Sequence, residues 1–262
     1  HEKRVGHGGT LDPMATGVLP VFLGRATRAV TFASESEKEY QFGLKLGVVT
    51  NTQDVTGEIV RQTPFIGTAE DLLAVLPTFR GDIQQVPPMY SAIKINGQKL
   101  YDLARKGREV ERAPRPVTIH ALELEDQLGP DEFLLRVRCS KGTYVRTLCH
   151  DIGAAVGCGG CMSSLRRTMA AGFTLADSVT LDAVLQADDP AALLLPVDAY
   201  FSGYPDLVAD PEQEKRIRNG AALPMPGLPD GRYRVYGQDG TFLALSQGEN
   251  GVLTTVKSFY EV

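Results

Sequence analysis

At residues 5–20 the chain reads VGHGGTLDPMATGVLP, a stretch that holds four glycines and one carboxylate, that of Asp12. Glycine adopts backbone conformations that other residues avoid and lets another molecule approach closely, so we expect a contact loop. Pro13 keeps Asp12 out of the helical region. The apolar run Val18–Leu23 predicts a buried strand after the loop. A carboxylate held on such a loop is typical of a catalytic group, although a carboxylate that caps a turn explains Asp12 equally well from the residues alone.

Four stretches in this order along the chain resemble motifs of the TruB family of tRNA pseudouridine-55 synthases. The first surrounds Asp12 and resembles the motif of the family's catalytic aspartate, with Gly8 where the family commonly has threonine. The family also carries an N-terminal segment with a Leu-Asp-Lys-Pro-type motif that is not found here, so we expect the sequence to represent a shortened form. The stretches are Gly6–Pro13 with Ala15–Leu19, Lys38–Tyr40, Cys139–Arg146 and Leu165–Arg167.

The resemblance implies an α+β fold of the pseudouridine-synthase type, with a mixed, mainly antiparallel sheet flanked by helices. It implies a catalytic domain at residues 1–198 and a small PUA-like β domain that binds RNA at residues 199–262. A thumb-like insertion at about residues 87–116 is implied to dock into the RNA T-loop.

The residue patterns predict most of the elements directly. Lys38–Leu46 alternates as a strand with one covered face. Thr68 with Asp71 predicts a helix that starts with a capping box, and Asn96-Gly97 predicts a hairpin. The other expected helices lie at 26–36, 100–106, 143–156, 180–186 and 210–220, and the other expected strands at 59–60, 117–124, 133–139 and within 232–256.

The charges are unevenly distributed along a chain whose net charge is −5. Residues 1–28, 94–115 and 141–167 together hold 15 Lys and Arg against 6 Asp and Glu, whereas the remainder holds 12 against 26. Binding a polyanion requires a basic face rather than a basic protein. Because the basic segments coincide with the motif segments and the insertion, the pattern favours RNA binding over charge that is merely solvated.

Length and cysteine content limit the class of protein. The 262 residues suffice for one large and one small domain, and no stretch is long and apolar enough to cross a bilayer, so we expect no membrane partner. Four cysteines are too few for a disulfide scaffold, which favours a reducing cytoplasm. Cys158 and Cys161 form a C-x-x-C that admits a redox or zinc role with Cys149 and His150, but a second clear ligand pair is missing and we expect neither. We also expect a monomer.

The resemblance implies isomerisation of a uridine in the T-stem-loop of tRNA, without metal or organic cofactor. Asp12 would act as a covalent partner or as a base. Arg146 would pair with it and keep it ionised where a docked RNA excludes water. Tyr40, which core packing alone would also explain, would stack on the flipped uracil, and Tyr144 would supply a hydroxyl group.

Further residues are implied to bind the RNA. Leu165 would form an apolar floor, and His7 would stack or hydrogen-bond within the RNA loop, although an ordinary turn histidine explains it almost as well. The remaining expected contacts are cations for phosphate groups, each of which a plain surface residue also explains: Arg28, Lys99, Arg105, Arg166 and Arg167.

Two other functions stay open at this point. One is a tRNA-binding folding factor in which catalysis is dispensable or lost. The other is a guide-dependent relative that modifies ribosomal RNA within a larger particle. Release of tritium from C5-labelled uridine in tRNA separates an enzyme from a pure binder.

Overall fold

The computed structural model describes residues 2–260 and divides into two compact units. The unit called here the sheet unit comprises Leu11–Val18 and Glu35–Ala176, and the terminal unit comprises the described residues through Thr10, Leu19–Ser34 and the residues from Asp177 onward. Within the terminal unit, N-terminal and C-terminal segments bind each other, since Arg28 donates from Nη1 to the Ser258 carbonyl oxygen at 2.9 Å.

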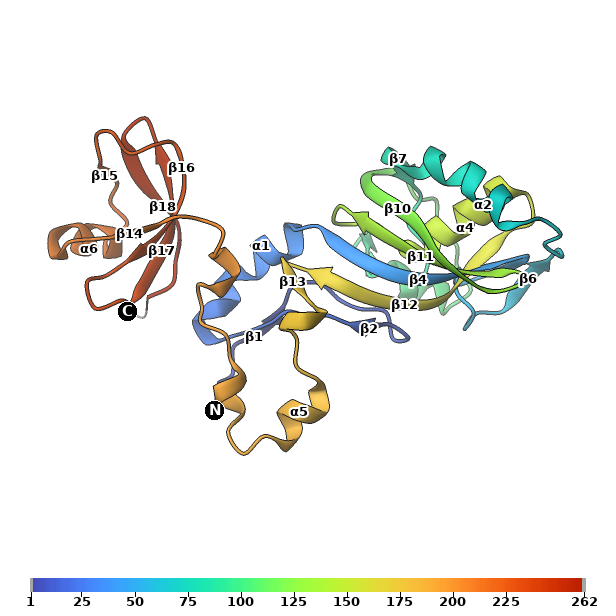
Figure 1. Ribbon diagram of the computed structural model, residues 1–262, viewed down its shortest axis with the longest axis horizontal. Coiled ribbons are helices and arrows are strands. Elements are labelled where there is room, and N and C mark those ends of the chain that lie inside the picture. The colour runs from blue at the N-terminus through green and yellow to red at the C-terminus, as the bar shows by residue number, and fades with distance from the viewer. Residues whose placement is uncertain (1, 261–262) are drawn as a thin grey trace. The chain divides into compact units, whose positions relative to one another are not determined.

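A seven-stranded sheet forms the centre of the sheet unit (Figure 1). Its strand order is β13-β12-β4-β11-β10-β7, all antiparallel, and the short β2 pairs in parallel with β12. The mainly antiparallel sheet of the expected fold class is thereby confirmed. The strands are β2 (Thr16–Gly17), β4 (Lys38–Leu46), β7 (Gly81–Gln85), β10 (Arg115–Gly129), β11 (Glu132–Cys139), β12 (Gly160–Ala170) and β13 (Phe173–Thr174).

Two helices, α2 (Ala69–Val75) and α4 (Val145–Val156), cover one face of this sheet. The apolar positions of β4 point toward them, because Phe42, Leu44 and Leu46 are fully buried. The predicted capping box starts α2, where the Asp71 carboxylate accepts from the backbone N–H of Thr68 at 2.8 Å. A 3-10 turn, η2 (Leu76–Phe79), continues α2 toward β7.

Helix α4 is fastened closely to β12. It ends at Gly157, whose φ of 97° lies in the left-handed region that favours glycine at a helix end. One turn earlier, a Cβ atom at Gly153 would lie 2.1 Å from the backbone nitrogen of Gly160. Any side chain at this position would push the helix off the sheet, so the close approach fixes the height of α4 above β12.

Smaller elements complete the sheet unit. The predicted hairpin around Asn96 forms from β8 (Lys94–Ile95) and β9 (Gln98–Lys99), and α3 (Leu100–Ala104) follows it. A second short ribbon pairs β5 (Val48–Thr50) with β6 (Ile59–Gln62).

The terminal unit contains an N-terminal ribbon and a C-terminal β domain. The ribbon pairs β1 (Val5–His7) with β3 (Val21–Leu23), and a 3-10 helix, η1 (Gly24–Ala29), leads into α1 (Val30–Glu35). The C-terminal sheet has the order β14-β16-β17-β18-β15. Its strands and the capped helix are β14 (Asp206–Val208), α6 (Pro211–Arg218), β15 (Leu223–Pro224), β16 (Gly231–Tyr236), β17 (Phe242–Glu249) and β18 (Val252–Ser258).

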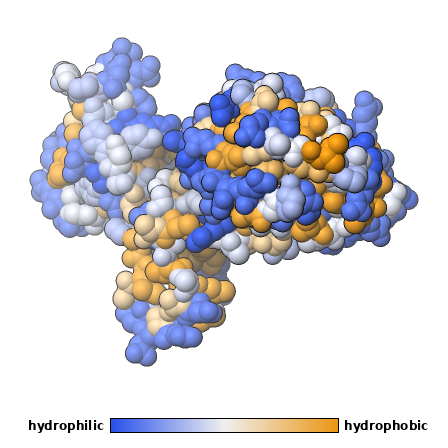
Figure 2. All heavy atoms as spheres, turned by 45° about the vertical axis from the view of Figure 1, so that its right-hand side comes forward, coloured by the Kyte–Doolittle hydropathy of each residue, from blue (hydrophilic) through white to orange (hydrophobic). Residues whose placement is uncertain are grey.

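The segment at residues 175–201, which precedes the C-terminal β domain in the sequence, exposes several large apolar side chains. It carries α5 (Leu181–Gln186), which Thr180 caps by accepting from the backbone N–H of Ala183, and three 3-10 turns, η3 (Leu175–Asp177), η4 (Pro190–Leu193) and η5 (Ala199–Phe201). Figure 2 shows hydrophobic side chains gathered low in the view, around the place that α5 has in Figure 1. The exposed large hydrophobic residues of the segment are Val179, Leu181, Leu185, Leu193, Leu194 and Leu195.

The structure corrects one expected strand and adds one that was not expected. The strand expected at Val18–Leu23 begins only at Val21, because Val18 instead donates its backbone N–H to the Arg167 carbonyl oxygen at 2.8 Å. Strand β12 was not predicted, although it lies between β4 and β13 in the sheet. No helix among residues 2–260 is long and apolar enough to span a membrane.

Candidate active site and RNA-contacting residues

Asp12 lies on the loop that precedes β2 and is paired with Arg146. The guanidinium group of Arg146 donates from Nε to Asp12 Oδ2 at 2.8 Å and from Nη2 to Asp12 Oδ1 at 3.3 Å. This two-point geometry is the strong form of an arginine–carboxylate pair. The Arg146 side chain is 7% exposed and the Asp12 side chain 35% exposed, so the cation is buried while its carboxylate partner remains open to another molecule.

The remaining donors of Arg146 are bound to two loops. Nη1 donates to the Thr52 carbonyl oxygen at 3.0 Å, and Nη2 donates to the Tyr90 carbonyl oxygen at 2.8 Å. Because these partners are backbone atoms from separate parts of the chain, the guanidinium group has a defined orientation that does not depend on Asp12. The charge beside Asp12 is thus held in place before any substrate arrives.

A second carboxylate, Asp54, balances the buried cation. Its Oδ2 lies 3.8 Å from Nη1 of Arg146, and its side chain is only 10% exposed. Its Oδ1 accepts from the Thr52 hydroxyl at 2.9 Å, the Thr56 backbone N–H at 3.0 Å and the Thr56 hydroxyl at 2.5 Å. Sequence reasoning missed Asp54, because it lies in a turn-rich stretch where an aspartate next to threonines is typical of ordinary turn formation.

Tyr40 and Leu165 lie on adjacent central strands. Tyr40 packs half-buried against the core from β4, and burial raises the pKa of its hydroxyl, an effect that the positive charge of Arg167 opposes. Leu165 is 8% exposed on β12, where it pairs with Phe42 of β4. Both side chains pack in the hydrophobic core cluster of the sheet unit.

Arg167 does not lie on the surface as a phosphate contact requires. It is 1% exposed, and its Nε donates to the Val18 carbonyl oxygen at 2.8 Å. At Gly17, which pairs with Arg167, φ is 100° and a Cβ atom would lie 2.1 Å from the Arg167 carbonyl oxygen. The expected phosphate contact is therefore wrong for this residue, which instead fastens the end of the Asp12 loop to β12. Its neighbour Arg166 is exposed.

The hairpin and helix at residues 94–104 place two expected cations on one aromatic ring. Lys99 Nζ donates to the Tyr101 hydroxyl at 2.9 Å, a bond that raises the pKa of Lys99. The Arg105 guanidinium carbon lies 5.3 Å from the centroid of the same ring. Both charged groups are thus oriented by Tyr101.

Tyr144, His7 and Arg28 complete the set of expected residues. Tyr144 is half-buried and lies directly before α4. His7 and Arg28 belong to the terminal unit, where His7 is exposed on β1 and Arg28 is half-buried and bound to Ser258.

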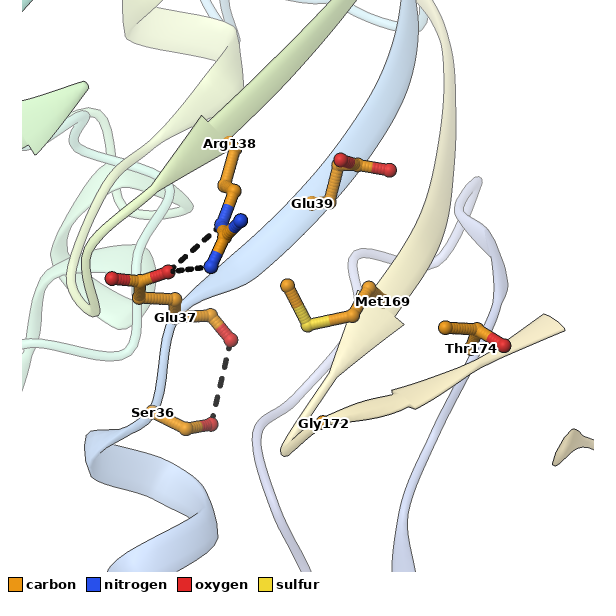
Figure 3. Close-up of a pocket in the computed structure, with 7 residues that line it drawn as sticks. All are labelled: Ser36, Glu37, Glu39, Arg138, Met169, Gly172 and Thr174. Carbon is orange, nitrogen blue, oxygen red and sulfur yellow. Dashed lines mark hydrogen bonds and ion pairs between the residues drawn. The ribbon is translucent and has the colours of Figure 1, made fainter. Parts of the chain in front are cut away.

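A hollow of about 490 Å³ lies on the sheet unit, and Asp12, Tyr40, Tyr144 and Arg146 are not among the residues that line it. Its lining includes Glu37, Glu39, Arg138 and Met169. Figure 3 shows the Glu37 carboxylate closed onto the Arg138 guanidinium, with distances of 2.8 Å to Nε and 2.7 Å to Nη2. The carboxylate groups of this hollow are already paired, since Glu39 also accepts from the Thr168 hydroxyl. It does not offer an unpaired reactive group.

The four cysteines are free and buried. Burial raises the pKa of the Cys139 and Cys161 thiols to about 11, and that of Cys149 well above its usual value. Thiols in such surroundings are unreactive. Among residues 2–260 there is no group of three or more His, Cys, Asp or Glu side chains arranged to hold a metal ion.

Two family domains match the chain. The TruB family pseudouridylate synthase N-terminal domain matches residues 1–145, and the tRNA pseudouridylate synthase B C-terminal domain matches residues 146–202. A tRNA pseudouridine synthase B of Clostridium kluyveri is 39% identical over 98% of this chain and 90% of the relative. One of Azoarcus sp. is 46% identical over 95% of this chain and 83% of the relative.

Solved structures support the same fold. A Cbf5-Nop10-Gar1 complex contains a chain with a TM-score of 0.70 at 24% identity, which matches 99% of this chain and 77% of that one. An H/ACA ribonucleoprotein bound to a substrate RNA contains one with a TM-score of 0.71 at 22% identity, with the same coverage.

Proposed function

Because the chain belongs to the TruB family of pseudouridylate synthases, we propose that it isomerises uridine 55 in the T-loop of tRNA to pseudouridine, with Asp12 as its catalytic carboxylate. The relatives named tRNA pseudouridine synthase B support the enzyme class, an isomerase that acts on tRNA. The match covers nearly the whole chain and most of each relative, so it supports the proposed activity for the whole chain rather than for one domain alone.

The observation that carries the role of Asp12 is its pairing with a buried, oriented arginine. The Arg146 guanidinium is bound at the same time to Thr52 and Tyr90, so its two hydrogen bonds to Asp12 orient the carboxylate. The pair would hold this carboxylate in one position when a docked RNA covers the site.

The reaction makes three demands on this site. The bond between C1′ and N1 of the uridine breaks, the base turns, and a bond between C1′ and C5 forms, after which C5 loses its proton and N1 gains one. Asp12 would act as covalent partner or as base in these steps. The target base must leave its stack, and the Tyr40 ring together with Leu165 would receive it. The Tyr144 hydroxyl would lie near the base.

Several parts of the chain would bind the rest of the RNA. We assign the insertion at residues 87–116 as a thumb whose Lys99 and Arg105 contact phosphate groups in the T-stem-loop. Arg28, Arg166 and His7 would add contacts, and residues 199–262 would form a PUA-like RNA-binding domain. We propose a monomer in the cytoplasm that uses neither metal nor organic cofactor.

The decisive experiment replaces Asp12 with asparagine, which keeps size and most hydrogen bonds and removes the charge. With tRNA labelled by tritium at C5 of uridine, turnover should fall by at least roughly 10³-fold, the scale of a deleted covalent or basic group. Affinity for tRNA should stay the same or rise slightly, because a carboxylate near phosphates is repulsive. Exposed Asp188→Asn is the matched control and should turn over at the wild-type rate.

Each other outcome points to a different function. Near-normal tritium release from a folded Asp12→Asn protein would reject Asp12 as the catalytic group. A wild-type protein that binds tRNA but releases no tritium would instead be a tRNA-binding folding factor. Release that requires a guide RNA would identify the guide-dependent class.

A further inference from the structure

The side chain of Gln85, at the end of β7, makes two hydrogen bonds with the backbone of Tyr144. Its Nε2 donates to the Tyr144 carbonyl oxygen at 3.2 Å, and its Oε1 accepts from the Tyr144 backbone N–H at 3.0 Å. Gln85 is 1% exposed. A buried amide is costly unless both of its ends are bonded, and here both ends are bonded to the same residue.

Tyr144 is the residue that needs such a partner. It precedes the first turn of α4 in an extended conformation, and none of its side-chain atoms caps the helix. Its carbonyl oxygen already accepts from the backbone N–H of Leu148 at 3.0 Å, so Gln85 adds a second donor to the same oxygen. The backbone of Tyr144 and the entry of α4 are thereby held from outside the helix.

The same segment also reaches Arg146. Five residues after Gln85, the Tyr90 carbonyl oxygen accepts from Arg146 Nη2 at 2.8 Å. Pro87 and Pro88 lie between the two contacts and are both buried. Proline restricts its own backbone and that of the residue before it, so the distance between the two contact points is well defined.

We propose that Gln85 is a positioning residue, which acts through the Tyr144 backbone to aim the Tyr144 ring and, two residues further on, to hold Arg146 against Asp12. The inference rests on the function proposed above. An amide suits this role because it presents a donor and an acceptor in a single plane, whereas methionine of similar length has no N–H or O–H donor and only a weak acceptor. Gln85 itself contacts no reacting atom.

The test compares Gln85→Met with Gln84→Met. Gln84 is the preceding residue of β7 and is exposed, so it receives the same substitution on the same strand without the Tyr144 contacts. Gln85→Met should lower the single-turnover rate at saturating tRNA by about 10- to 100-fold, the scale of a small misplacement of catalytic groups. The dissociation constant for tRNA should be unchanged, and Gln84→Met should match the wild type in both quantities.

Two further measurements distinguish a positioning role of Gln85 from a simple loss of folding: one uses the variant Gln85→Asn, and the other repeats Gln85→Met in a protein that also carries Tyr144→Phe. Gln85→Asn keeps donor and acceptor but is one methylene shorter, so its loss should be smaller than that of Gln85→Met. All rates are measured below the melting midpoint of each variant. In a Tyr144→Phe background, Gln85→Met should cost less than in the wild type, because both changes act on the same group.

The outcomes that overturn the role of Gln85 are specific. Wild-type rates in both Gln85 variants, a weaker tRNA affinity with an unchanged rate, or an equal fold-loss in the Tyr144→Phe background would each reject it. These results differ from failure of the proposed function, in which the wild-type protein itself would release no tritium.

Discussion

The sheet unit contains two sets of arginine–carboxylate pairs that differ chiefly in burial. Arg146 is 7% exposed and pairs with Asp12, whereas Arg138 is 52% exposed and pairs with Glu37 through contacts of similar length. Arg136, on the same exposed face, lies close to Glu39, Glu123 and Glu125. The chemical groups are the same in both places.

The comparison teaches that the environment of the pair, rather than its chemistry, distinguishes Arg146 from Arg138. An exposed pair contributes about 0–1 kcal/mol, because water already stabilises both charges. Removing one partner of a buried pair costs about 3–5 kcal/mol, because the remaining charge is left without water. Breaking the Arg146–Asp12 pair should therefore cost more free energy than breaking the Arg138–Glu37 pair.

The largest expected effect follows from Arg146→Lys, which keeps the charge and loses the planar fork. Lysine cannot bind Asp12, Thr52 and Tyr90 at once, so turnover should fall by about 10²- to 10³-fold. Tritium release at saturating tRNA measures this loss. The matched change Arg138→Lys should leave turnover at the wild-type level, and an equal loss in the two variants would show that burial does not distinguish them.

An intermediate effect is expected on β4, where neighbouring residues face opposite sides. Tyr40→Phe keeps the ring and should retain most turnover, whereas Tyr40→Leu should lose about 10- to 100-fold, the scale of base–aromatic stacking of about 1–3 kcal/mol. Glu39→Gln, on the polar side of β4, is the control and should leave turnover at the wild-type level. If the Phe and Leu variants lose turnover equally, stacking is not the role of Tyr40.

The smallest expected effect concerns the exposed face itself. Arg138→Ala should change the free energy of unfolding by no more than about 1 kcal/mol and leave turnover unchanged, and high salt should shrink even this difference. Chemical denaturation at low and high salt measures it. A clear loss of turnover would mean that the hollow beside Glu37 takes part in the function.

Much of the fold was predictable because its signals are local. Lys38–Leu46 alternates as its strand does, Asn96-Gly97 forms its hairpin, and Gly157 ends α4 as expected. The family resemblance drawn from the four motif stretches is confirmed by both family matches. Strand β12 escaped prediction, because it begins Gly160-Cys161-Met162, small and apolar residues that are buried without alternation.

The site was predictable only in part, because contacts between distant residues leave no local signal. The motif containing Arg146 suggested its pairing with Asp12, 134 residues away, but the Thr52, Asp54 and Tyr90 contacts of the guanidinium group could not be read from spacing. Arg167 was misread for the same reason. A charged side chain is normally exposed, and only its bond to Val18 shows that this one is internal.

The burial of all four cysteines has a practical consequence for labelling. Maleimide dyes react with the thiolate, and burial raises the pKa of Cys139 and Cys161 to about 11. A single cysteine introduced at an exposed position, for example Ala113→Cys in the insertion, would then be the preferred attachment point in the folded protein. The natural thiols need not be removed first, so a fluorophore at residue 113 could report the arrival of tRNA in an otherwise unaltered chain.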